Sequence, residues 1–135
     1  MDFVDKTTVF VFPGQEDTPE DERAKVAIRP CNFSKVQEII KRHTIKKVEF
    51  HKDRKRDPLQ RFEVEESNDD AMFEDSWDYS ITEWENVHYG DEKNLACTRE
   101  NKLMLLRKSV FFLTCATNWR DAMEAEYEES RAEGN

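Results

Sequence analysis

The feature that most restricts the fold of this 135-residue chain is a pair of apolar rows in its second half. Phe73, Trp77, Ile81 and Trp84 recur at intervals of four, four and three residues, which is the spacing of one face of an α-helix. The second row lies on one side of a final helix and consists of Phe112, Ala116, Trp119, Met123 and Tyr127. Two amphipathic helices are therefore predicted.

Hydroxyl and amide side chains stand where helices are expected to begin. Ser67 with Asp70, Thr98 and Ser109 each precede an apolar run, and such residues commonly accept hydrogen bonds from the first turn of a helix. Thr98 predicts a short helix between the two long ones. Residues 67–130 are thus expected to hold about three helices, followed by a frayed tail over 131–135.

The first half has the pattern of strands. Residues 7–12 are β-branched and aromatic and end at Pro13-Gly14, so they predict a strand and a turn. Further strands are expected at 24–28, 45–50 and 61–64. Ser34 and Gln37 have the spacing of a capping box and predict a short helix ending near His43. We expect one small, largely antiparallel sheet with a helix against it over residues 1–66, and hence an α+β fold.

Length and charge narrow the class of protein. A chain of 135 residues fits a single domain, 1–135. The net charge of −9 argues against nucleic acid or an anionic membrane as the main partner. No apolar run is long enough to span a bilayer, and the N-terminus lacks the pattern of a signal peptide, so we expect a cytoplasmic location. The three cysteines have neither disulfide-framework nor zinc-site spacing.

The charges are unevenly distributed along the chain. Basic residues crowd the region 46–56, and those of its turn are Lys52, Arg54, Lys55 and Arg56. Residues 62–92 contain no Lys or Arg but twelve Asp or Glu. This polarity suits head-to-tail self-association or docking onto another protein. The alternative interpretation is a solvated surface on which the two signs neutralise each other.

No catalytic, cofactor or metal motif is present. The glycines are isolated, and a Cys97–His88 pair would have nothing local to orient the imidazole. The acids around Asp69 and Asp78 lack the spacing of a calcium loop. We therefore predict a protein that is not an enzyme and that uses no cofactor or metal.

Apolar residues of the final helix are the candidate protein interface. A core this small is expected to leave some apolar surface uncovered, which would then form a partner site. Besides the basic turn, the candidates are Phe111, Phe112, Trp119, Met123 and Tyr127. Trp77, on the apolar row of its helix, is expected to be structural.

Three short segments carry a family resemblance: Trp84-Glu85-Asn86-Val87, then Gly90-Asp91, then Cys97-Thr98-Arg99-Glu100-Asn101-Lys102. In this order the chain resembles tail assembly chaperones of tailed phages and prophages over about residues 68–120. The resemblance implies a non-enzymatic protein, acting in the host cytoplasm, that coats the tape-measure protein and helps to recruit tail-tube subunits. It also implies that Trp84 and Thr98 are structural and that the final helix contacts the partner.

Other roles stay open, because the acidic N-terminal loop and the basic 46–56 segment depart from the family pattern. The main alternative is a virion protein stably incorporated in the tail or the head–tail junction, as a connector or minor tail protein. A small acidic inhibitor directed at a host protein is a further alternative. Either phage role allows a homo-oligomer.

Overall fold

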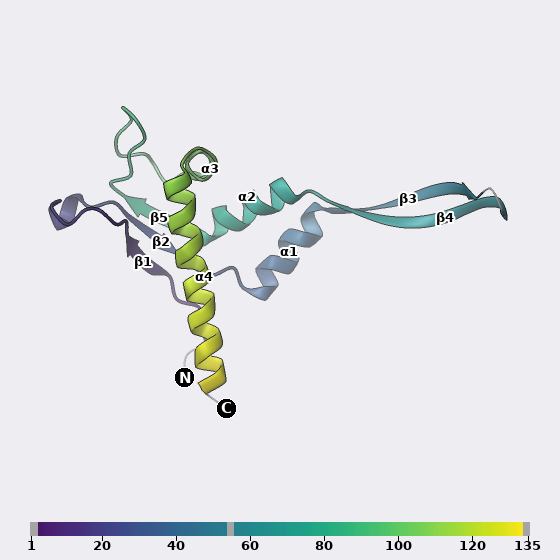
Figure 1. The fold of residues 1–135 in the computed structure, drawn as a ribbon, viewed down its shortest axis with the longest axis horizontal. Coiled ribbons are helices and arrows are strands. Elements are labelled where there is room, and N and C mark those ends of the chain that lie inside the picture. Colours follow the sequence, from purple (N-terminus) through teal and green to yellow (C-terminus); the bar gives the residue numbers. More distant parts are fainter. Residues whose placement is uncertain (1–2, 54–55, 134–135) are drawn as a thin grey trace. The chain divides into compact units, whose positions relative to one another are not determined.

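The computed structural model describes residues 3–53 and 56–133, without the side chains of 50–53, 56–61 and 127–133. The described chain is α+β, as predicted, with small antiparallel sheets and four α-helices. It forms two compact units (Figure 1). Unit 1 comprises residues 1–31 and 77–135, and unit 2 comprises residues 32–76, so the units do not follow the predicted strand-rich and helical halves.

Unit 1 contains a three-stranded antiparallel sheet in the order β1-β2-β5. The predicted N-terminal hairpin is confirmed: β1 (Thr8–Val11) pairs with β2 (Lys25–Ile28). The turn after β1 uses Gly14 at a φ of 86°, a left-handed conformation that glycine adopts without strain. The long connection contains a short 3-10 helix, η1 (Glu20–Glu22).

The third strand corrects the expected four-turn helix over Phe73–Trp84. Helix α2 (Asp69–Ser80) ends earlier, and Ile81–Glu85 forms strand β5 beside β2. The register shifts between Ala27 and Ile28, because β5 carries one additional residue, Thr82, between the paired Ile81 and Glu83. Such a bulge brings Ile81 and Trp84 to the same buried side. Their separation of three residues, read as helical, is that of a bulged strand.

Helices α3 (Arg99–Lys108) and α4 (Val110–Glu133) complete unit 1. Both predicted caps are confirmed: Thr98 Oγ1 accepts from Asn101 N at 3.2 Å, and Ser109 Oγ accepts from Phe112 N at 3.1 Å. Helix α4 continues to Glu133, and residues 134–135 of the predicted frayed tail lie outside the described residues.

The core of unit 1 lies between the sheet and the two C-terminal helices. Phe12 lies 5.6 Å from Phe112 and 5.0 Å from Trp119 between ring centroids, and Trp84 contacts Phe112 edge-on at 5.9 Å. The other buried apolar side chains of this unit are Val26, Ala27, Ile28, Trp77, Ile81, Val87, Leu105, Leu106, Ala116 and Met123. Large aromatic rings thus pack together with aliphatic side chains in the core of this unit.

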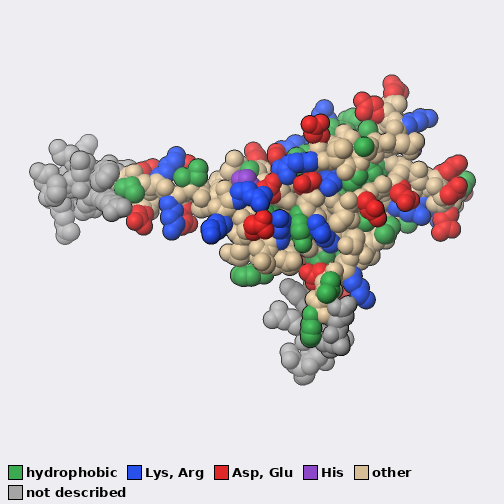
Figure 2. Space-filling model, turned by 180° about the vertical axis from the view of Figure 1, so that it is seen from behind, with side chains coloured by type: hydrophobic (Ala, Val, Ile, Leu, Met, Phe, Trp, Pro, Cys, Tyr) green, Lys and Arg blue, Asp and Glu red, His purple; other side chains and the backbone are tan. Residues whose placement is uncertain are grey.

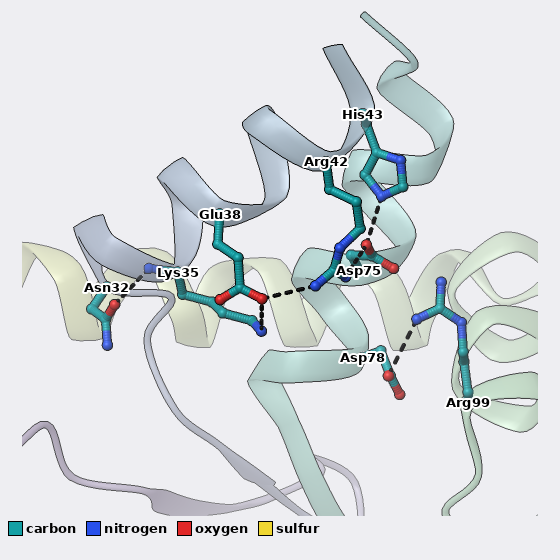
Figure 3. A network of polar contacts seen from close by, with 8 residues as sticks. All are labelled: Asn32, Lys35, Glu38, Arg42, His43, Asp75, Asp78 and Arg99. Atoms are coloured by element: carbon teal, nitrogen blue, oxygen red, sulfur yellow. Dashed lines mark hydrogen bonds and ion pairs between the residues drawn. The ribbon is translucent and has the colours of Figure 1, made fainter. Parts of the chain in front are cut away.

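Unit 2 contains α1 (Phe33–His43), β3 (Thr44–Asp53), β4 (Arg56–Ser67) and the first part of α2. The expected cap at Ser34 is wrong: the N-cap of α1 is Asn32, two residues earlier, and Asn32 Oδ1 accepts from Lys35 N at 2.9 Å. Likewise Asn68, rather than Ser67, caps α2 through Ala71 N. Lys35, Glu38 and Arg42 form ion pairs along α1 (Figure 3).

Strands β3 and β4 form a separate two-stranded sheet, so the single N-terminal sheet that we expected is in fact two. The hairpin is longer than the predicted strands, pairing from Thr44 with Ser67 outward to Asp53 with Arg56. Ile45, Val48 and Phe62 on it are exposed. Lys47 forms an ion pair with Glu66 at 2.7 Å. Lys and Glu side chains and apolar side chains occur together on the described part of the hairpin (Figure 2).

Candidate protein-docking site

The start of α4 carries the most exposed apolar pair of unit 1 outside its N-terminal segment. Val110 is 81% and Phe111 56% exposed, although both lie in a regular helix beside the buried Phe112. Helix geometry explains this contrast, because consecutive residues point about 100° apart and only one of the three can face the sheet. Phe111 therefore projects from the molecule at the edge of its aromatic core.

A cavity of about 270 Å³ opens beside Phe111. Its apolar lining comes from the connection between β1 and β2, the loop after β5, α3 and α4, and includes Phe12, Ala24, Val87, Leu105, Phe111 and Phe112. The Phe111 and Phe12 rings lie 6.2 Å apart. The volume is smaller than the ~300–1,000 Å³ of typical small-molecule sites. It suits one apolar side chain.

Two polar groups at the cavity are already engaged within unit 1. Gln15 Nε2 donates to the carbonyls of Phe12 and Ala24, and Gln15 Oε1 accepts from Ala24 N at 2.6 Å. His88 Nδ1 accepts from Asn94 N at 2.8 Å. These bonds engage the Gln15 amide and Nδ1 of His88, so the cavity presents mainly apolar surface.

The structure distributes the predicted interface residues differently. Phe112 and Met123 are buried, and Trp119 is half-buried with its ring stacked 4.9 Å from Phe10. These three side chains pack in the core of unit 1, where Trp119 keeps some exposure. Tyr127 lies on α4, but its side chain is outside the described residues. Phe111 is thus the described candidate that faces outward.

The basic turn falls largely outside the description. Lys52 ends up in β3 and Arg56 in β4, without described side chains, and Arg54 and Lys55 lie outside the described residues. Their role as a docking surface stays a prediction.

The motif residues of the family resemblance build the connection between β5 and α3. Trp84 is buried and its Nε1 donates to Leu95 O at 2.7 Å. Asn86, at a φ of 56°, donates to the carbonyls of Asp21 and Arg23. Asn101 Nδ2 donates to Ala96 O at 2.8 Å. These side chains satisfy backbone groups, which is a structural task.

The surroundings of two cationic side chains in unit 1, Lys102 and Arg120, were not anticipated from the sequence. Lys102 is only 7% exposed and its Nζ lies 3.1 Å from both the carbonyl and Oδ1 of Asp78, while Arg99 reaches Asp78 Oδ2 at 3.3 Å (Figure 3). Arg120 stacks its guanidinium 3.6 Å from the centre of the buried Trp77 ring. Burial lowers the pKa of Arg120. Only the position of Lys102 on the helical wheel of α3, next to Leu105 and Leu106, offered a signal.

Cys97 and His88, the pair considered in the sequence analysis, each have described surroundings in unit 1. Burial raises the pKa of the Cys97 thiol, and a reactive cysteine needs the opposite shift. His88 uses Nδ1 to accept from a backbone N–H.

A His–Asp pair exists in unit 2, where His43 Nε2 lies 2.6 Å from Asp75 Oδ2 (Figure 3). Arg42 Nη1 donates to the same oxygen at 3.0 Å. Through these contacts the pair links α1 to α2.

In the described part of the chain, no group of three or more His, Cys, Asp or Glu side chains is placed to hold a metal ion. None of its helices combines the length and the apolar character needed to cross a membrane.

Comparisons with protein-family models, with curated proteins and with solved structures find no match to this chain.

Proposed function

We propose that this chain is a non-enzymatic protein-binding protein whose docking site is Phe111 with the adjoining apolar cavity. The observation that carries the proposal is an exposed aromatic side chain at the mouth of an apolar cavity. The Gln15 and His88 side chains that line this cavity already form hydrogen bonds within unit 1. An apolar side chain from a partner helix would fill the cavity and cover Phe111. Aromatic anchors of this kind carry much of the energy of protein interfaces.

The proposed partner follows from the resemblance of residues 68–120 to tail assembly chaperones. On that basis the docking site binds the tape-measure protein. Tail-tube subunits are then recruited in the same assembly process. Cys97 with its raised pKa and the engaged His88 support a role without catalysis.

The test is co-expression with a tape-measure protein from the source genome, followed by affinity measurement on the purified pair. Phe111→Glu places a charge at the cavity mouth and is expected to weaken binding about tenfold or more. Phe33→Glu is the matched control, since Phe33 is also an exposed phenylalanine but lies on α1 of unit 2. Equal loss in both variants, or none in either, would contradict this assignment of the site.

The β3–β4 hairpin favours a second candidate, a virion protein that stays in the tail or head–tail junction. Isolated two-stranded hairpins are marginally stable in water, and Ile45, Val48 and Phe62 are exposed on this one. Neighbouring subunits of a finished particle would cover such an arm permanently.

Quantitative mass spectrometry of purified particles distinguishes the two candidates. A chaperone is expected to be abundant in the infected-cell lysate and absent from particles. A fixed copy number per particle, in multiples of six or twelve, would instead support the virion protein and a ring-forming role.

A further inference from the structure

The three-stranded sheet of unit 1 has two outer strands, β1 and β5. Their open edges differ in how well they are protected against pairing with another strand. Exposed Glu83 and Glu85 lie on β5. On β1 the sequence Thr8-Val9-Phe10-Val11 contains no charge and no proline, and no strand of the described chain pairs with its outer edge. Natural sheets usually protect an edge with charge, proline or a cover, because an unprotected edge pairs with other strands.

The hydrogen-bond parity of β1 shows which groups point outward. Phe12 N donates to Ala24 O at 3.1 Å, so the backbone of Phe12 faces β2. In an antiparallel ladder the backbone N–H and C=O groups of successive residues point alternately to the two sides of the strand. The backbone of Phe10 therefore also faces β2, and the N–H and C=O groups of Val9 and Val11 point to the open edge. The side chains of Val9 and Val11 are 58% and 45% exposed.

We propose that β1 is a self-association edge that pairs antiparallel with β1 of a second copy. The two sheets would join into one continuous sheet of six strands, with a two-fold axis through Phe10. Val9 of one copy then lies opposite Val11 of the other, and their outward groups exchange four backbone hydrogen bonds. This register uses every outward group of the two valines, whereas a register centred on Val11 would place Val9 opposite Pro13, which has no N–H.

Charge selects β1 over β5 for this contact. The whole chain has a net charge of −9, so two copies repel each other over most surfaces. Antiparallel pairing through β5 would bring Glu83 and Glu85 of the two copies together, which destabilises a strand pair. The β1 edge presents only valine, threonine and phenylalanine, so a second copy meets no like charge there. The hydrogen bonds of this contact come from Val9 and Val11, which do not line the Phe111 cavity, so self-association does not require the proposed function.

The proposed contact is short, so the dimer is expected to be weak. Four residues on each side bury less than the ~1,200–2,000 Å² of stable complexes. We expect a reversible dimer, populated at high protein concentration.

Sedimentation velocity over a concentration series is the first test. The full chain is expected to shift from monomer toward dimer with increasing concentration. Val9→Lys, which places a charge on the open edge, is expected to stay monomeric while circular dichroism shows a retained fold. Glu83→Lys on β5 is the matched control and should still dimerise. A monomer at every concentration, or a dimer that persists in Val9→Lys, overturns the proposal.

Disulfide mapping tests the register directly. A Val9→Cys chain is mixed with an isotopically labelled Val11→Cys chain and oxidised, and linked peptides are identified by mass spectrometry. The proposal expects mixed links, in which the new thiol of one variant is joined to the new thiol of the other. Links between two Val9→Cys chains should be rare, because their thiols would lie on a diagonal beyond ~7 Å between Cα atoms. A predominance of those same-variant links, or a foreign strand on this edge in place of a second copy, overturns it.

Discussion

The ammonium group of Lys102 is the clearest case of one residue whose surroundings decide its effect. Its Nζ is held by two oxygens of Asp78, one of the backbone and one of the side chain, at 3.1 Å each. A buried cation is stable only when such partners replace the lost water. Arg99 contacts the same carboxylate from a more exposed position. The two cations thus share a partner but differ in burial.

Asp78→Ala is expected to reduce the free energy of unfolding by about 1–3 kcal/mol, because it leaves the Lys102 ammonium buried with one acceptor. Arg99→Ala removes a half-exposed ion pair to the same carboxylate and should cost less than about 1 kcal/mol. Urea unfolding followed by tryptophan fluorescence measures both. Similar losses would show that burial of Lys102 is energetically unimportant.

The thiols of Cys97 and Cys115 should react slowly in the folded protein. Burial is the main cause that raises the pKa of each. Alkylation requires the thiolate, so iodoacetamide should label both more slowly in the native chain than in denaturant. Because the folded pKa lies above the unfolded value of about 8.5, this contribution to stability is complete below that pH and is lost as pH rises toward the folded pKa. Mass spectrometry of labelled peptides across pH 7–10 measures the rates, and equal native and denatured rates would contradict the expectation.

Among the secondary-structure elements, α3 depends on a single hydroxyl at its beginning. Thr98→Ala removes the bond to Asn101 N and is expected to cost about 1 kcal/mol. Thr114→Ala is the control, since Thr114 is an exposed threonine within α4, where alanine has the higher helix propensity. Thermal unfolding of both variants gives the comparison. A Thr98→Ala protein as stable as the control would mean that water replaces the cap at no cost.

The sequence was most informative where local chemistry decides the structure, and least where pairing between distant residues does. The Thr98 and Ser109 caps and the turn at Pro13-Gly14 follow from side chains near the backbone groups that they serve. Strand β5 was missed because a bulge at Thr82 gives Ile81 and Trp84 the spacing of a helix, and that bulge exists only through pairing with β2. Phe111 was recognisable as a candidate, but the apolar row of the final helix, which starts at the buried Phe112, did not show which of its members the sheet would cover.

On the scale of the whole molecule, unit 2 is inserted between two neighbouring strands of unit 1. Near the insertion, Arg29 N donates to Ser80 O at 2.9 Å, so the chain leaves and re-enters unit 1 at adjacent points. Unit 1 also contains nearly all the buried apolar residues in the described chain, with Ile39 as the exception. Its stability should therefore depend little on the inserted residues.

Replacing residues 32–76 by a short glycine–serine linker is expected to leave unit 1 folded. The variant should keep a cooperative thermal transition and the near-ultraviolet signal of Trp84 and Trp119, with a lower midpoint because α2 is shortened. Circular dichroism and calorimetry measure this. A variant without a cooperative transition would show that the chain is a single cooperative domain, as its length suggested.

The same insertion sets an order of events during translation. Strands β1 and β2 emerge from the ribosome first, but β2 ends at Ile28 and β5 begins only at Ile81, and α4 comes later still. All of unit 2 is synthesised in between and is free to form while the apolar face of the β1–β2 hairpin has no cover. The nascent chain therefore exposes Phe10, Phe12 and Val26 until the last helix is synthesised. During this interval a ribosome-associated chaperone would bind them.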